Sequence, residues 1–194
     1  EMVLGPDRES VLVMDQYGRL STTSAAMTID PAPPTFGDPR VRSFALTPDY
    51  NGIYTLDGNG RVYPSGTAPA LNPATPVFGQ DIAIKIKLRR DGKGYYVLDR
   101  RGNVYAGGNA PALKANYTIH TNEDWARDFE LTEDETGYYL LDKFGGVSTG
   151  GSAPAPGAPA WGQWADGTAM DLEVADSRGE PGLELSLPSP QLSL

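Results

Sequence analysis

The chain repeats itself at an interval of about 42 residues, and this repeat limits the possible folds more than any other feature. Its clearest mark is a D-x-x-G-x-[VL] pattern, whose glycines are Gly18, Gly60, Gly102 and Gly145. These glycines stand 42, 42 and 43 residues apart. Two further columns keep the same step. They are the aspartates Asp15, Asp57, Asp99 and Asp142, and the upstream residues Leu4, Leu46, Leu88, Leu131 and Val174.

Each unit is predicted to consist of short β-strands joined by turns. An alternating segment such as "RSFAL" or "IKIKL" comes first, a second segment such as "IYTLD" or "YYVLD" follows, and the D-x-x-G turn leads into "RVYPSG" or "NVYAGG". Alternation with period two, together with tyrosine and β-branched residues, is typical of strands. The 23 glycines and 17 prolines favour many turns. No segment shows sustained helical periodicity, so no helix is expected.

Three or four strands in about 42 residues is the size of one β-propeller blade. The pattern resembles propeller repeats with a P-D-G-type turn, a "YVxD" strand and a D-x-x-G hairpin, and especially the "GYYVLDxxGxVxxxGxAP" repeats of bacterial extracytoplasmic proteins. The resemblance implies an all-β propeller, similar in architecture to WD40 and NHL propellers, and an extracellular or cell-surface location. The WD40 signature itself is absent. An open β-solenoid is the alternative architecture.

The repeats cover residues 1–174, and a divergent tail rich in proline and leucine covers residues 175–194. The expected units are 1–41, 42–83, 84–126 and 127–168, with a fifth unit beginning at 169. After residue 174 the tyrosines and the D-x-x-G turn are lost, although Gly182–Leu187 ("GLELSL") still alternates. The chain also opens on Glu1 rather than Met. Three arrangements therefore stay open: a fragment of a larger propeller, a tail that completes the sheet of the first unit, or a ring built from two chains.

The repeated residues themselves are expected to be structural. The aspartates should accept backbone N–H bonds in the turn, and the glycines should supply a positive φ. The leucine column should be core, together with the residues two positions earlier. These earlier residues are Phe44, Ile86, Phe129 and Leu172. A calcium site at "DGNG" (Asp57–Gly60) is not favoured, because the completing glutamate is missing and the equivalent turns carry arginine, lysine and phenylalanine.

Charges in the first strand of each unit predict a contact between neighbouring units. Lys85 and Lys87 lie in the third unit, at the positions that Asp128 and Glu130 occupy in the fourth. First strands of neighbouring propeller blades lie side by side, so we expect the two lysines to face the two acids across a blade boundary. The alternative is a basic patch that binds an anionic glycan or a phosphate.

A candidate binding face follows from the turns, which should emerge on one side of a propeller. Exposed aromatic and arginine residues are common in contacts with proteins and carbohydrates. The candidates at hairpin tips are Tyr17, Arg100, Arg101 and Phe144, and those near the links into the first strands are Trp125 and Trp164. The alternative for both tryptophans is that they pack between units.

The sequence favours a binding or structural role over catalysis. A net charge of −9 argues against generic nucleic-acid binding, and the absence of cysteine excludes thiolate metal sites. His120 is the only histidine, and it stands in a connecting region where a solvated loop position is expected. No catalytic motif, membrane-spanning run or cofactor signature is recognisable. We therefore expect a non-enzymatic extracytoplasmic module that binds a protein, a glycan or copies of itself. The alternative is part of a propeller-type hydrolase or lyase whose catalytic residues lie elsewhere.

Overall fold

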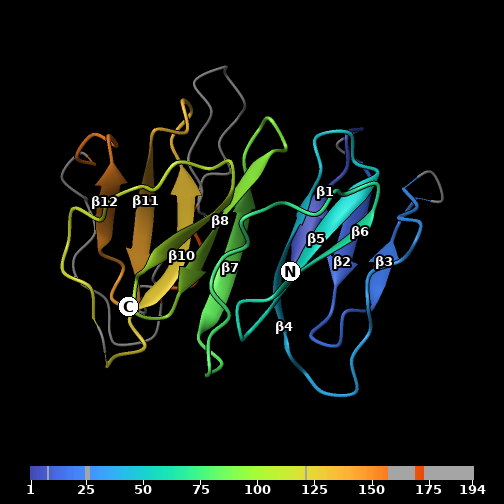
Figure 1. Cartoon of the computed structure of the whole chain (residues 1–194), viewed down its shortest axis with the longest axis horizontal. Coiled ribbons are helices and arrows are strands. Elements are labelled where there is room, and N and C mark those ends of the chain that lie inside the picture. The colour runs from blue at the N-terminus through green and yellow to red at the C-terminus, as the bar shows by residue number, and fades with distance from the viewer. Residues whose placement is uncertain (8, 25–26, 121, 157–168, 173–194) are drawn as a thin grey trace, which may run out of the picture.

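A computed structural model describes residues 1–7, 9–24, 27–120, 122–156 and 169–172 of the chain. The described residues form an all-β fold of twelve strands in four separate three-stranded antiparallel sheets, without a helix (Figure 1). The first sheet contains β1 (Met2–Leu4), β2 (Val11–Met14) and β3 (Leu20–Thr22). The second contains β4 (Val41–Leu46), β5 (Gly52–Asp57) and β6 (Val62–Gly66). The third contains β7 (Ala83–Leu88), β8 (Gly94–Asp99) and β9 (Val104–Gly108), and the fourth contains β10 (Ala126–Leu131), β11 (Gly137–Asp142) and β12 (Val147–Gly151).

Each sheet is one sequence repeat, and its three strands pair in the order in which they occur along the chain. The first strands of the second, third and fourth sheets share an irregularity at the same place, at Val41/Ser43, Ala83/Lys85 and Ala126/Asp128. A β-bulge bends its strand and changes the direction of the next side chain. The repeat therefore extends to the backbone of the first strand as well as to the sequence.

The D-x-x-G turns have the geometry that the sequence predicts. Asp57 Oδ1 accepts hydrogen bonds from the backbone N–H groups of Asn59 at 3.0 Å and Arg61 at 2.9 Å. Equivalent pairs of bonds are accepted by Asp15, Asp99 and Asp142. The closing glycines all have a positive φ, between 82° and 87°. These aspartates and glycines thus have structural roles in the turn.

Neighbouring sheets pack face to face through three apolar clusters. Leu12 and Met14 of the first sheet pack with Phe44 and Ile53 of the second. Tyr54 and Leu56 of the second pack with Ile86, Tyr95 and Val97 of the third. Tyr96 and Leu98 of the third pack with Phe129, Tyr138 and Leu140 of the fourth. The core thus lies between the sheets, where each unit covers the apolar face of the next.

The leucine column is less buried than the sequence predicts. Phe44, Ile86 and Phe129 are at most 2% exposed, but the leucines two positions later are only partly buried. Leu4, the member in the first sheet, is 54% exposed. The main core residue of the first strand is therefore the earlier one. The last member of the column, Val174, lies outside the described residues.

The strands that begin each unit lie toward the middle of the molecule. In Figure 1, β7 lies near the centre of the view, whereas the third strands β3 and β12 lie at its two edges. Strand β7 contacts both β4 and β10, the first strands of the units before and after it. No helix in the described part of the chain is long and apolar enough to cross a membrane.

Candidate functional site

The structure brings the charged residues of neighbouring first strands together. Lys85 Nζ lies 3.3 Å from Asp128 Oδ1, and Lys87 forms an ion pair with Glu130. The ammonium of Lys85 also lies 3.1 Å from Glu1 Oε1 and 3.8 Å from Asp171 Oδ1. We name the group of Lys85, Glu1, Asp128 and Asp171 the Lys85 cluster. It joins the first, third, fourth and fifth units at one point.

Residues at the same repeat position as Lys85 connect each first strand to the next. Glu1 Oε2 accepts a hydrogen bond from the N–H of Phe44 at 2.8 Å, and Ser43 Oγ accepts one from the N–H of Ile86 at 3.2 Å. Asp128 Oδ2 accepts one from the N–H of Leu172 at 3.1 Å. Lysine has no acceptor atom, so Lys85 cannot make this bond. Its ammonium instead lies among the carboxylates of three other units.

Burial shifts the ionisation of the Lys85 cluster. Asp128 is 1% exposed, and this burial, together with the nearby carboxyl group of Asp171, raises its pKa to about 7, although Lys85 acts in the opposite direction. Burial alone would lower the pKa of Lys85, but Glu1 and Asp128 outweigh it and raise that pKa. Asp128 Oδ1 accepts no hydrogen bond from the described residues, despite its separation of 3.3 Å from the ammonium. The cluster is thus sensitive to pH.

The turn tips carry four of the predicted binding residues: Tyr17, Arg100, Arg101 and Phe144. We use this name for the two residues between the aspartate and the glycine of each D-x-x-G turn. Phe144 is 36% exposed, with the ammonium of Lys143 4.9 Å from its ring centroid. Tyr17 is half-buried, and the guanidinium of Arg19 lies over its ring at 5.1 Å. Each of these two tips therefore places an aromatic ring beside a cation.

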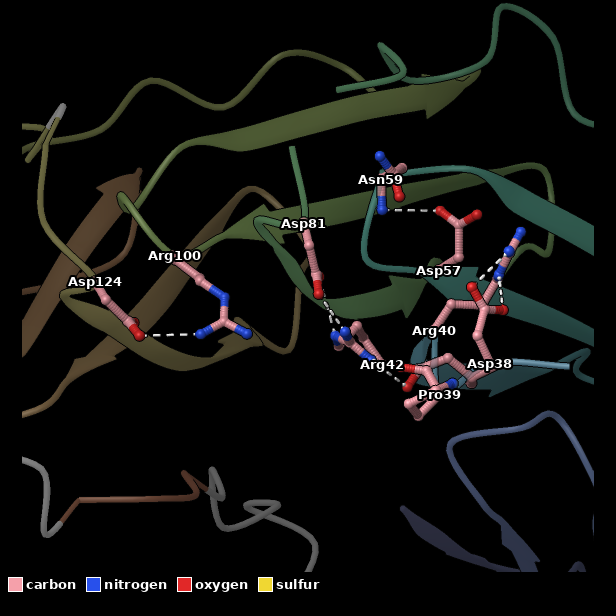
Figure 2. Close-up of polar contacts among 10 residues, drawn as sticks. Asp38, Pro39, Arg40, Arg42, Asp57, Asn59, Asp81, Arg100 and Asp124 are labelled. Carbon is pink, nitrogen blue, oxygen red and sulfur yellow. Dashed lines mark hydrogen bonds and ion pairs between the residues drawn. The ribbon is translucent and has the colours of Figure 1, made fainter. Parts of the chain in front are cut away.

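Arg100 and Arg101 have different surroundings although they are adjacent. Arg100 donates to Asp124 Oδ2 at 2.9 Å, which connects the third unit to the link before β10 (Figure 2). Its Nε is buried and has no hydrogen-bond partner among the described residues. Arg101 donates to Gln80 Oε1 at 3.0 Å. Arg100 is therefore held by an ion pair with the link that enters the fourth sheet, whereas the group that Arg101 contacts is uncharged.

Trp125 does not lie at an exposed rim. It is 7% exposed and packs on Gly102, with the rings of Tyr117 and His120 beside it at centroid distances of 5.6 and 4.5 Å. Of the two alternatives for this tryptophan, packing between units is the one that the structure contains. His120 is accordingly half-buried rather than a solvated loop residue, with Nδ1 3.4 Å from Glu123 Oε2. Trp164 lies outside the described residues.

A further set of ion pairs, which the sequence analysis did not predict, involves the links that enter the third and fourth sheets. Arg42 in β4 pairs with Asp81, which precedes β7 by two residues (Figure 2). Asp124 precedes β10 by the same distance, and it accepts bonds from Arg100 and from Arg127, the repeat equivalent of Arg42. An aspartate two residues before a first strand is a signal that alignment of the repeats could have found.

A groove lies beside the Lys85 cluster, between β1, β4 and β7. Its volume is about 390 Å³, and its lining includes Glu1, Phe44 and Ile86 together with the cations Lys87, Arg89 and Arg90. Lys87 and Arg89 already pair with Glu130 and Glu135. The sequence did not indicate this groove, because its lining comes from three units whose relative placement only the tertiary structure defines.

No family model and no curated protein matches the chain. Among solved structures, a crystal structure of a Bacteroides uniformis protein described as a "putative 6-phosphogluconolactonase" matches with a TM-score of 0.41 and 18% identity. The match covers 84% of this chain and 52% of that protein, so the chain spans about half of its length.

Proposed function

We propose that the four sheets are consecutive blades of a β-propeller, and that this propeller is a non-enzymatic, extracytoplasmic binding module. The Lys85 cluster supports the ring arrangement. One ammonium lies within 4 Å of carboxylates from the first, fourth and fifth units, a contact that is expected if the units are grouped around a common centre. The inner strands of propeller blades surround a central channel in this way. The extracytoplasmic location rests on the resemblance of the repeats alone.

We further propose that the turn tips bind an anionic glycan. The observation that carries this is their composition: the four tips contain three cations, two aromatic residues and no acid, in a chain of net charge −9. The turn is framed by the aspartate and the glycine, so the two residues between them are not needed to form it. Aromatic rings stack on sugars, while cations pair with sulfate or carboxylate groups.

The test is binding of heparin and of polygalacturonate to the full chain, measured by calorimetry. Arg101→Ala and Phe144→Ala should each weaken binding by about tenfold, which corresponds to about 1.4 kcal/mol. Lys114→Ala removes an exposed cation outside the turn tips and serves as the control. No binding of either glycan by the unmodified chain, or an equal loss with the control variant, would overturn the proposal.

The raised pKa of Asp128 favours a second candidate, a propeller-type hydrolase or lyase. A carboxyl group that keeps its proton near neutral pH is suited to general acid catalysis. Two observations stand against it. Asp128 already accepts the Leu172 N–H, and His120 stacks on Trp125 instead of lining the groove. Release of reducing ends from a polysaccharide by the unmodified chain, abolished in Asp128→Asn, would favour this candidate.

A further inference from the structure

The first sheet has an apolar face that is exposed, whereas the equivalent face of the second, third and fourth sheets is buried. At the position of Met2 in the repeat, the later units have Phe44, Ile86 and Phe129, each of which is at most 2% exposed. At the position of Val13 they have Thr55, Val97 and Leu140, all 0% exposed. These buried side chains belong to the face of each sheet that packs on the preceding unit. In the later units, this face of the sheet therefore packs on the facing side of a neighbouring unit.

In the first sheet the same face is uncovered. Met2 is 65% exposed, Leu4 is 54% exposed and Val13 is 43% exposed. Met2 and Val13 are opposite each other in the pairing of β1 with β2, and Leu4 lies on the same side of β1 two residues on. We name these three side chains the outer face of the first sheet. Apolar side chains gathered in this way indicate a surface that packs against another structural element.

The fifth unit begins beside this face. The N–H of Leu172 is bonded to Asp128 of β10, so the fifth unit starts against the fourth sheet. Asp171 and Glu1 both contact the ammonium of Lys85, at 3.8 and 3.1 Å, which brings the start of the fifth unit close to Glu1, the residue before β1. A unit that continued from this point would lie between the fourth sheet and the first.

We propose that residues 173–194 pack on the outer face of the first sheet, so that the fifth unit closes a five-unit ring. Their sequence fits this role, because Leu183, Leu185 and Leu187 alternate with polar residues in "GLELSL". A strand with this alternation presents one apolar side, which can pack on another apolar face. The inference rests on the ring arrangement proposed above but is independent of the proposed glycan binding.

Single cysteines test the proposal directly, because the chain contains none. Val13→Cys and Val77→Cys place a thiol on two valines that are 43% and 57% exposed. In the full chain, the thiol of Val13→Cys should react with a maleimide at least about tenfold more slowly than that of Val77→Cys, because it is covered. Adding Leu183→Asp and Leu185→Asp to Val13→Cys should restore the fast rate, while circular dichroism stays unchanged.

The oligomeric state decides which chain covers the thiol. Protection in a monomer, measured by light scattering and lost in the two-aspartate variant, supports closure by residues 173–194. Protection that appears only in a dimer would assign the face to a second copy and overturn the proposal. Equal labelling of Val13→Cys and Val77→Cys would overturn it as well, as would protection that survives the aspartate substitutions. Glycan binding is measured separately, so either proposal can fail without the other.

Discussion

At the scale of single residues, the turn determines which positions can vary. Asp99 accepts bonds from the N–H groups of Arg101 and Asn103 at 2.9 and 2.8 Å, and from the hydroxyl of Tyr105 at 3.0 Å. Gly102 closes the same turn with a φ of 87°. Neither residue can be replaced without loss of the turn, because one supplies the acceptors and the other the conformation. Arg100 and Arg101 lie between Asp99 and Gly102, and the turn can form with other side chains at these two positions.

Replacement of Gly102 by alanine should therefore destabilise the protein. Alanine is strained at a positive φ, and its Cβ would lie 2.9 Å from Cζ3 of Trp125. We expect the free energy of unfolding to fall by about 2 kcal/mol, measured by urea denaturation. Gly79→Ala is the matched control, because a Cβ at Gly79 meets nothing within 4 Å. Equal stability of the two variants would contradict the assigned role of Gly102.

At the scale of elements, an aromatic side chain that follows the third strand covers the turn of its own unit. Phe78 packs on Gly60, and its ring lies 5.0 Å from that of Tyr105 in the next unit. Phe36 lies near Gly18 and 5.3 Å from Tyr63 in the same way. In the third unit, Trp125 takes this place over Gly102. The link between sheets thus carries part of the packing between them.

Truncation of one such aromatic should weaken the packing between two units. Phe78→Ala should lower the free energy of unfolding by about 2 kcal/mol, because it leaves space over Gly60 and beside Tyr105. Val77→Ala changes the preceding residue, which is 57% exposed, and should stay within about 0.5 kcal/mol of the unmodified protein. Urea denaturation of both variants checks this. A larger effect at Val77 would show that the link packs differently.

At the scale of the whole molecule, the first strands hold the units in register through side chains that reach the next backbone. Glu1, Ser43 and Asp128 each accept an N–H bond from a residue at the equivalent place in the following unit. Lys85 occupies the equivalent position in the third unit. Instead of accepting this bond, it forms ion pairs with carboxylates of three other units. Buried ion pairs contribute little on balance, but loss of one partner leaves a buried charge uncompensated. The stability of the assembly should therefore depend on the charge state of this cluster.

Removal of the Lys85 ammonium should be costly mainly at high pH. Lys85→Met should lower the free energy of unfolding by about 3 kcal/mol near pH 8, where Asp128 is ionised. Near pH 5 the carboxyl group of Asp128 is protonated and the loss should be about half as large. Lys114→Met, an exposed lysine elsewhere, should have no effect at either pH. Urea denaturation at both pH values measures the difference, and an equal loss at both would contradict the assignment.

The unmodified protein should itself lose stability as the pH rises through neutrality. The pKa of Asp128 is about 7 in the folded protein and 3.8 as its ordinary value, so the folded state binds this proton more tightly. The resulting stabilisation is complete below about pH 4 and is lost as the pH rises through about 7. The stability difference between the unmodified protein and Asp128→Asn should therefore fall between about pH 5 and pH 8. A difference that stays constant would show that Asp128 is not the titrating group.

Much of the architecture could be predicted from the sequence because the repeat makes local geometry visible. The all-β class, the three strands of each unit and the roles of Asp57 and Gly60 follow from a turn that is formed within a few residues. The pairing of Lys85 with Asp128 was also predictable, because one repeat position in neighbouring units must lie side by side. The burial of Trp125 was not, because it depends on Gly102 and Tyr117, which lie in other segments of the chain.

The sequence by itself determined the unit: its length, its strands, its turn and the positions that hold them. Only the tertiary structure decided how the units meet. Lys85 faces Glu1, Asp128 and Asp171 at once, and Met2 and Val13 are exposed although the residues at their positions in the second, third and fourth units are buried. The physical reason is that a turn is stabilised by bonds within a few residues, whereas the charge balance and the uncovered face depend on residues from units far apart in the chain.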